Sequence, residues 1–171
     1  ETGFFFTHRI RTLTRPSVVF LGIAGTLIVA LLAAFFFFRH LVVKSFPVTG
    51  GTVAVAGLQS PVDVYRDPYG IPHVIAAGME DLMFAVGYVH AQDRLWQMDL
   101  MRRAGEGRLS ELFGKKTLEM DMMFRMIGLP RVAAAIEPAL SPESRNALES
   151  YAGGVNAFIA SHRGKYPAEF D

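Results

Sequence analysis

The chain has 171 residues, of which 51% are hydrophobic and 19% are charged, and it contains no cysteine. This length suits one domain, and the composition excludes a disordered or collagen-like chain. The absence of cysteine from the sequence also excludes a disulfide-stapled miniprotein, cysteine-ligated zinc and a cysteine nucleophile. Eight of the 14 phenylalanines lie within the first 38 residues, so much of the apolar content belongs to one end.

The charge is unevenly distributed as well. The formal net charge is +1, but residues 45–171 hold 12 Lys and Arg against 15 Asp and Glu. The part of the chain that can fold in water is therefore mildly acidic, with a net charge of −3. This balance argues against a nucleic-acid partner.

Residues 18–38 form an uncharged stretch of 21 residues that follows a basic N-terminal segment, residues 1–17. About 20 helical residues span a hydrocarbon core of about 30 Å, so the stretch predicts a single transmembrane anchor. A cleaved signal peptide is the alternative, but its apolar part usually has only about 7–15 residues and ends at small residues. Here four phenylalanines and Arg39 close the stretch, which favours an uncleaved anchor.

The arginines and lysine around this stretch predict its orientation. Three arginines precede it, whereas Arg39 and Lys44 follow it, so the small bias places the N-terminus inside. Residues 39–51, with Pro47 and two glycines, are expected to form a tether. We therefore expect a single-pass, membrane-anchored protein whose C-terminal part is periplasmic or extracellular.

Short strands are expected after the tether. Apolar and polar residues alternate over 52–55 and 62–65, which is typical of half-buried strands, and residues 73–76 predict a third. Between the second and the third, residues 67–72 (DPYGIP) form a dense turn signal.

The period then changes to that of a helix. From Met79, a stripe of Leu82, Val86, Val89, Trp96 and Leu100 predicts a buried helical face, with Asp93 completing its spacing. The glycines at 105 and 107 are expected to end this helix, and residues 109–113 to add one turn that Gly114 closes.

Two further helices are expected towards the C-terminus. Thr117 predicts the cap of a methionine-rich helix that ends near Ile127, with Pro130 just beyond it. Ser141 and Pro142 form a good start signal for the last helix. Its expected apolar face is Leu148, Tyr151, Val155, Phe158 and Ile159.

Most candidates for chemistry have a simpler explanation. Residues 105–107 (GEG) follow a helix and lack a subsequent Lys-Ser/Thr, so they are not a phosphate-binding loop. The five histidines show no metal-ligand spacing, and His73 and His90 are expected to have structural hydrogen bonds. All eight methionines fall between residues 79 and 126, where their spacing indicates core packing or an interface whose partner is missing.

One polar cluster is unusual. Residues 90–97 (HAQDRLWQ) place five polar groups within an otherwise apolar helix, and Asp93 occupies the predicted buried stripe. A buried carboxylate needs a cation or several donors. We therefore predict a structural ion pair between Asp93 and Arg94, Arg102 or Arg103.

Several segments resemble the start of the penicillin acylase (penicillin amidase) family. Residues 66–73 (RDPYGIPH) and 87–98 (GYVHAQDRLWQM) carry the strongest likeness. Similar runs follow in the same order at residues 102–103 (RR), 107–114 (GRLSELFG), 151–159 (YAGGVNAFI) and 167–170 (PAEF). Ser110 stands where alanine is more usual, and the likeness covers residues 50–171.

The resemblance implies an α+β fold: the mainly helical N-terminal portion of a four-layer αββα N-terminal-nucleophile hydrolase, here spanning residues 52–171. In that family a precursor cleaves itself into a smaller alpha chain and a larger beta chain. The serine freed at the start of the beta chain attacks an amide carbonyl, with its own α-amino group as base. Substrates are N-acyl compounds such as β-lactam side-chain amides, acyl-homoserine lactones and acylated peptides.

None of the family's catalytic residues falls on a position of this sequence, so no catalytic, cofactor-binding or metal-binding residue is assigned. The resemblance leaves calcium open for the complete enzyme, and it implies the beta chain, the membrane and a small N-acyl substrate as partners. We expect the segment to be inactive alone. The alternative is a non-catalytic, membrane-tethered interaction module.

Overall fold

The computed structural model describes residues 15–44, 46–47 and 49–170, with side chains from residue 18 onward. The chain divides into two compact units, residues 1–43 and 44–171, which are described separately below. Most of the predicted basic segment, residues 1–14, lies outside the described residues.

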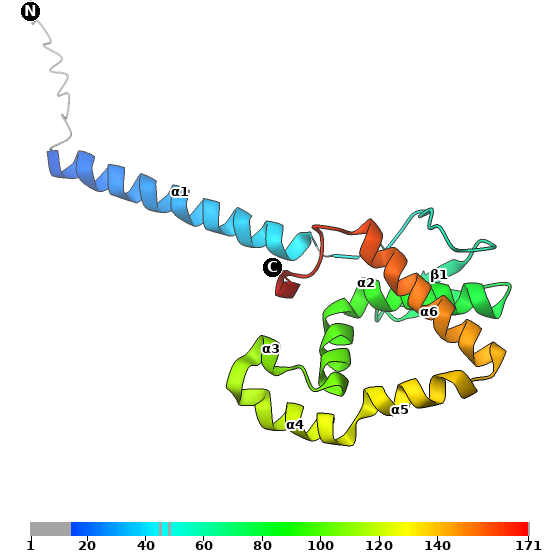
Figure 1. Cartoon of the computed structure of the whole chain (residues 1–171). Coiled ribbons are helices and arrows are strands. Elements are labelled where there is room, and N and C mark those ends of the chain that lie inside the picture. The colour runs from blue at the N-terminus through cyan, green and yellow to red at the C-terminus, as the bar shows by residue number, and fades with distance from the viewer. Residues whose placement is uncertain (1–14, 45, 48, 171) are drawn as a thin grey trace, which may run out of the picture. The chain divides into compact units, whose positions relative to one another are not determined.

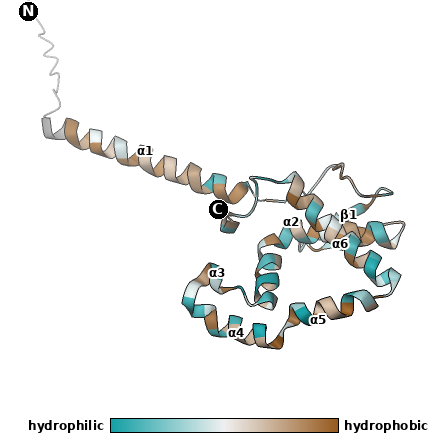
Figure 2. Cartoon of the chain, in the orientation of Figure 1, coloured by the Kyte–Doolittle hydropathy of each residue, from teal (hydrophilic) through white to brown (hydrophobic). Residues whose placement is uncertain are grey.

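The first unit is one long apolar helix. α1 (Arg15–Val43) has 29 residues, and its stretch Val18–Val43 is long and apolar enough to cross a membrane, a test that a signal sequence also passes. Hydrophobic residues cover most of this helix in Figure 2. The tether is shorter than predicted, because residues 39–43 continue the helix and Pro47 is the first residue beyond it that is incompatible with a helix interior.

A two-stranded antiparallel hairpin begins the second unit. β1 (Asp63–Arg66) pairs with β2 (Pro72–Ile75), with Arg66 opposite Pro72 at the closed end. The turn forms as predicted: Asp67 accepts hydrogen bonds from the backbone N–H groups of Tyr69 and Ile71, both at 2.9 Å. The predicted strand at residues 52–55 is wrong, because no described strand pairs with it.

α2 (Met79–Glu106) is the longest helix of this unit, and it is broken near its middle. Arg94 has non-helical angles (φ −141°, ψ 20°), and the two halves run in different directions in Figure 1. The helix ends as predicted at Gly107, which adopts a left-handed conformation (φ 65°).

α6 (Pro142–Ser161) packs against the first half of α2 (Figure 1). A Cβ on Gly87 would lie 2.1 Å from the carbonyl oxygen of Tyr151, and one on Gly154 would lie 1.9 Å from that of Phe84. Glycine at both positions therefore lets the two backbones touch. A small core forms beside this crossing from Ala91, Leu95 and Phe158.

A series of short helices connects the end of α2 to the start of α6. It comprises α3 (Ser110–Phe113), a 3₁₀ turn (Gly114–Thr117), α4 (Leu118–Ile127), α5 (Leu129–Ile136) and a second 3₁₀ turn (Glu137–Ala139). Another 3₁₀ turn, Ala168–Phe170, lies near the C-terminus. The predicted end of the methionine-rich helix at Ile127 is confirmed, since Gly128 closes it with φ 73°.

One prediction at a helix start differs from the structure and two agree. Pro130 lies just beyond Ile127 as predicted, in the first turn of α5, where proline is tolerated because its missing N–H has no helical partner. Thr117 does not cap α4, since its hydroxyl donates a hydrogen bond back to the carbonyl of Gly114 at 3.3 Å. Ser141 caps α6 as predicted, accepting a bond from the N–H of Ser144 at 3.1 Å.

The predicted apolar faces are only partly correct. Of the α2 stripe only Val89 is buried, and its other members are half-buried: Leu82, Val86, Trp96 and Leu100. The buried hydrophobic residues of α2 also include Phe84, Ala85, Ala91 and Leu95, of which Ala91 and Leu95 share a core cluster with Phe158 of α6. On α6, Leu148 remains 55% exposed because the close contact with α2 lies further along the helix, around Gly154 and Phe158.

Candidate functional site

Asp93 forms the ion pair that the sequence predicts, but with a different arginine. The two terminal nitrogens of Arg66, on β1, donate to the two carboxylate oxygens of Asp93, both at 2.8 Å. The side chains of Arg66 and Asp93 are 15% and 20% exposed. The prediction of Arg94, Arg102 or Arg103 as partner is wrong, because α2 breaks at Arg94 and the hairpin lies against the break.

Arg66 also connects the hairpin turn to α2. Its guanidinium donates to the carbonyl of Gly70 at 3.0 Å and to the side-chain oxygen of Gln92 at 3.2 Å. One planar group thus joins β1, the turn and the residues just before the helix break. We refer to Arg66, Gly70, Gln92 and Asp93 as the Arg66 clamp.

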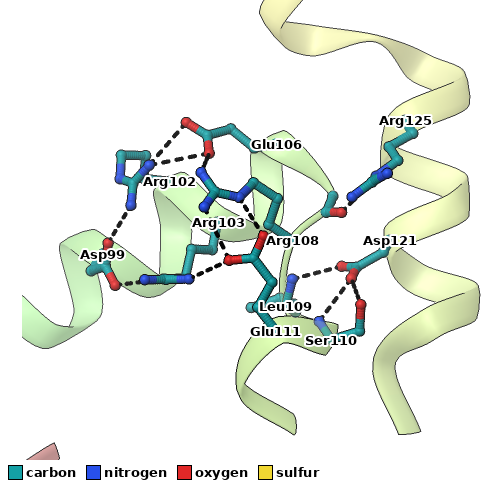
Figure 3. Close-up of polar contacts among 11 residues, drawn as sticks. Asp99, Arg102, Arg103, Glu106, Arg108, Leu109, Ser110, Glu111, Asp121 and Arg125 are labelled. Atoms are coloured by element: carbon teal, nitrogen blue, oxygen red, sulfur yellow. Dashed lines mark hydrogen bonds and ion pairs between the residues drawn. The ribbon is translucent and has the colours of Figure 1, made fainter. Parts of the chain in front are cut away.

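A closed ring of alternating charges connects the end of α2 to α3 (Figure 3). Asp99 accepts bonds from Arg102 at 2.6 Å and from Arg103 at 2.7 Å. Arg102 continues to Glu106 at 3.1 Å, and Arg103 continues to Glu111 at 2.8 Å. The ring is completed by Arg108, which donates to both Glu106 (2.9 Å) and Glu111 (2.8 Å).

The ring keeps its carboxylates ionised. Hydrogen bonds from Arg108 hold the pKa of Glu106 and of Glu111 below the usual range. Burial opposes ionisation of Asp99, but the bonds from Arg103 and Arg102 outweigh it, so the pKa of Asp99 is also lowered. The arrangement has three acids and three bases, and its charges neutralise one another rather than presenting a reactive group.

Asp121, on α4, is the most buried charged side chain among the described residues, with 2% exposed. It accepts bonds from the backbone N–H groups of Leu109 (2.8 Å) and Ser110 (2.7 Å), and from the hydroxyl of Ser110. Burial opposes its ionisation, but these bonds from Ser110 and Leu109 lower the pKa of Asp121 (Figure 3). The carboxylate therefore caps the start of α3 from outside that helix.

α4 is inverted relative to an ordinary amphipathic helix. Its polar side faces the rest of the unit, since Asp121 is buried and Arg125 donates to the carbonyl of Gly107 at 2.8 Å. Its large apolar side chains are exposed, and so are those of α5. We call this set the α4–α5 apolar surface: Leu118, Met120, Met122, Met123, Met126, Ile127, Leu129, Val132 and Ile136.

An open apolar groove of about 490 Å³ lies between α2, α6 and the C-terminal segment. Leu95, Met98 and Val155 line it, and Asp99 and Arg102 of the charge ring lie at its polar side. The lining of this groove is mostly apolar, as expected of a packing or binding surface.

The other sequence candidates are structural. His90 shares a hydrogen bond of 3.1 Å with the hydroxyl of Tyr151, and His73 lies 3.6 Å from Asp67. The described residues contain no group of three or more His, Cys, Asp or Glu that could hold a metal ion. Residues 105–107 end α2 and form no phosphate loop.

Sequence reasoning missed three important residues. Arg66 and Asp121 each bind a partner far away in the sequence, and no local pattern indicates such a pair. Gly87 was recognised within a motif, but its role at a helix crossing depends on the position of α6.

Comparison with known proteins identifies the family. Residues 61–171 match the penicillin amidase family, and the chain belongs to it. It is 42% identical over 123 residues to Penicillin acylase 2 proenzyme of Pseudomonas sp. (strain SE83), and 38% identical over 125 residues to acyl-homoserine lactone acylase QuiP of Pseudomonas aeruginosa. These alignments cover 72% and 73% of this chain.

A solved structure shares the architecture. The thermostable penicillin G acylase from Alcaligenes faecalis matches with a TM-score of 0.54 and 36% sequence identity, covering 60% of this chain and 55% of that chain. The chain spans only 16% of the Pseudomonas sp. relative and 15% of the P. aeruginosa relative. The comparisons thus show the family and the mainly helical fold, and this chain corresponds to only a part of each relative.

Proposed function

We propose that this chain is the N-terminal segment of a penicillin-amidase-like acylase that hydrolyses the amide bond of N-acyl compounds. The substrate class comprises β-lactam side-chain amides, acyl-homoserine lactones and acylated peptides. The observation that carries the proposal is the family match over residues 61–171, with relatives named as penicillin and acyl-homoserine lactone acylases.

In this proposal the reaction takes place on residues outside the chain. A serine at the start of a larger C-terminal chain attacks the amide carbonyl, and its α-amino group takes the hydroxyl proton and passes it to the amine that leaves as the C–N bond breaks. Water then hydrolyses the acyl-serine ester, which releases the acid and restores the serine. The described hydroxyls of Ser110, Ser141 and Ser161 are occupied in a buried network, a helix cap and helix carbonyls, which supports this placement. The complete enzyme would have the four-layer αββα sandwich, to which this segment contributes helices and a hairpin.

We further propose that α1 anchors the precursor (a zymogen) in the membrane, with the C-terminal part periplasmic or extracellular. The length and apolar composition of Val18–Val43 support an anchor. N-terminal sequencing of the mature protein tests this. A sequence that begins upstream of Val18 is expected, and one that begins after Phe38 would contradict the anchor and favour a cleaved signal.

Calcium belongs to this proposal only through the family resemblance. The resemblance leaves a calcium ion open for the complete enzyme, and we assign it no ligand among the described residues. Equilibrium dialysis of the complete protein with calcium would show whether it binds the ion.

The experiment that tests the proposed activity uses the complete protein and a chromogenic N-acyl amide with a phenylacetyl or longer acyl group. We expect turnover by the complete protein and none by residues 1–171 alone. Turnover by residues 1–171 would contradict our placement of the reaction. A complete protein that folds but cleaves no N-acyl amide would favour the alternative, a membrane-tethered interaction module.

A further inference from the structure

The break in α2 has no cause in the sequence around it. Residues 88–104 contain no proline, glycine or serine, the residues at which helices usually kink. Arg94, whose angles depart from those of a helix, is a good helix former. Its side chain is exposed and forms no hydrogen bond or ion pair with any other described residue. The local sequence therefore favours a continuous helix from Met79 to Glu106.

A contact from outside α2 meets the helix directly before the break. The guanidinium of Arg66, on β1, donates to both carboxylate oxygens of Asp93 at 2.8 Å and to the side-chain oxygen of Gln92 at 3.2 Å. Neighbouring side chains on a regular helix point about 100° apart, so they do not face a common partner. One planar group that holds Gln92 and Asp93 together thus favours a distorted backbone at this point.

The other contacts of α2 do not require the break. Ala91 and Leu95 share a core cluster with Phe158, but residues four apart lie on one face of an unbroken helix as well. The members of the charge ring on α2 all lie beyond the break. Trp96 contacts Phe170, with ring centroids 5.2 Å apart, and this aromatic contact is the rival cause of the break.

The break separates two different contacts between α2 and α6. Before the break, Gly87 and Gly154 let the two backbones touch. Beyond the break, both helices line the open apolar groove of about 490 Å³, to which α2 contributes residues between 95 and 102. The direction of the second half of α2 (Figure 1) therefore sets the width of the groove and the position of the charge ring.

We propose that the Arg66 clamp is a latch that holds α2 in its bent state, and that α2 adopts a continuous helix when the clamp is released. α2 is then a two-state element, and docking of the hairpin selects the bent state. The motifs at residues 66–73 and 87–98 supply the two sides of the latch. The latch is independent of the proposed function, because it concerns the conformation of α2 and not the reaction.

Distances measured across the break by double electron–electron resonance test the latch in the complete protein. Spin labels are attached at Glu80→Cys and Met101→Cys, two exposed positions on either side of the break, after replacement of any cysteine outside residues 1–171. These positions lie about 32 Å apart along a straight helix. We expect a shorter distance in the parent protein and a shift towards about 32 Å in Arg66→Met. A parent distance already at the straight-helix value would overturn the inference.

Two control variants separate the latch from a general loss of packing. Arg145→Met removes an exposed arginine–glutamate pair elsewhere in the same unit, and Phe170→Ala removes the contact with Trp96. Both should keep the parent distance. A lengthening in Phe170→Ala equal to that in Arg66→Met would assign the break to the aromatic contact, and an equal lengthening in Arg145→Met would indicate general loosening. Either result would overturn the latch.

Arg66→Lys decides the question where Arg66→Met fails to fold. Lysine keeps the positive charge but lacks the planar fork that holds both oxygens of Asp93 and the side chain of Gln92. We expect a mixture of the parent distance and the straight-helix distance in Arg66→Lys. The parent distance alone in Arg66→Lys, or an unchanged distance in a folded Arg66→Met protein, would contradict the latch.

Discussion

At the scale of single residues, Arg66 and Asp121 determine how the second unit is arranged. Each satisfies several backbone or side-chain groups that would otherwise be unpaired: Arg66 binds across the hairpin and α2, and Asp121 binds the start of α3. These contacts give both residues a conformational role within the unit.

The Arg66 clamp predicts a large effect of a single truncation. Asp93→Ala removes both bonds and leaves the guanidinium of Arg66 without a counter-charge. We expect local stability of the hairpin, measured by hydrogen exchange, to fall by about 2–3 kcal/mol. The control Glu80→Ala removes an exposed hydrogen bond to Gln59, and it should change the local stability of the hairpin by less than about 0.5 kcal/mol. Equal effects of the two variants would contradict the clamp.

The carboxylates of the charge ring and Asp121 predict acid sensitivity of α3. Their pKa values are lower in the folded than in the unfolded state, so their contribution is present above about pH 4 and is lost as the pH falls through the folded values. Protection of residues 109–113 against hydrogen exchange, corrected for the intrinsic rate, should therefore decrease below about pH 4.

A matched pair of variants tests whether the charge ring contributes to this acid sensitivity. Glu111→Gln should weaken the pH dependence, because it removes one titrating member of the ring. Glu143→Gln, in the first turn of α6 and outside the ring, should leave it unchanged. A constant protection of residues 109–113 from pH 6 to pH 3 would show that the ring contributes nothing there.

At the scale of elements, the crossing of α2 and α6 depends on glycine. Gly87→Ala would place a methyl group 2.1 Å from the Tyr151 carbonyl oxygen, so the helices must separate. We expect a loss of about 3 kcal/mol in unfolding free energy, at the upper end for overpacking.

Gly105→Ala is the matched control within the same helix. The nearest atom to its added Cβ would be a Leu129 methyl at 3.9 Å, an ordinary contact, so a gain of about 0.5–1 kcal/mol is expected. Chemical denaturation of both variants measures the difference. A Gly87→Ala variant as stable as the parent chain would contradict the close crossing.

The sequence predicts the local features of these elements and not their long-range contacts. Turn and cap signals at residues 67–72, Gly107 and Ser141 act within a few residues, and the structure confirms them. The buried face of α2 was predicted only in part, because the close contact with α6 at Phe84 and Gly87 involves residues outside the predicted stripe. The partner of Asp93 was missed because it lies 27 residues away on a strand.

At the scale of the whole molecule, the chain combines an apolar N-terminal helix with a helical unit that leaves much apolar surface exposed. The match to the penicillin amidase family explains the familiar motifs of the second unit. The motif at residues 87–98 indicates the family from the sequence. Composition and periodicity alone predict only a mainly helical chain with an apolar end.

The central claim is that this chain serves an amide-hydrolysing enzyme whose nucleophile lies elsewhere in the precursor. The most direct measurement treats the complete, active protein with a sulfonyl fluoride, which labels activated serines covalently, and maps the adduct by peptide mass spectrometry. We predict loss of activity with one adduct, on a serine at the N-terminus of a processed chain and outside residues 1–171. Inactivation by an adduct on Ser110, Ser141 or any other residue of this chain would contradict the account.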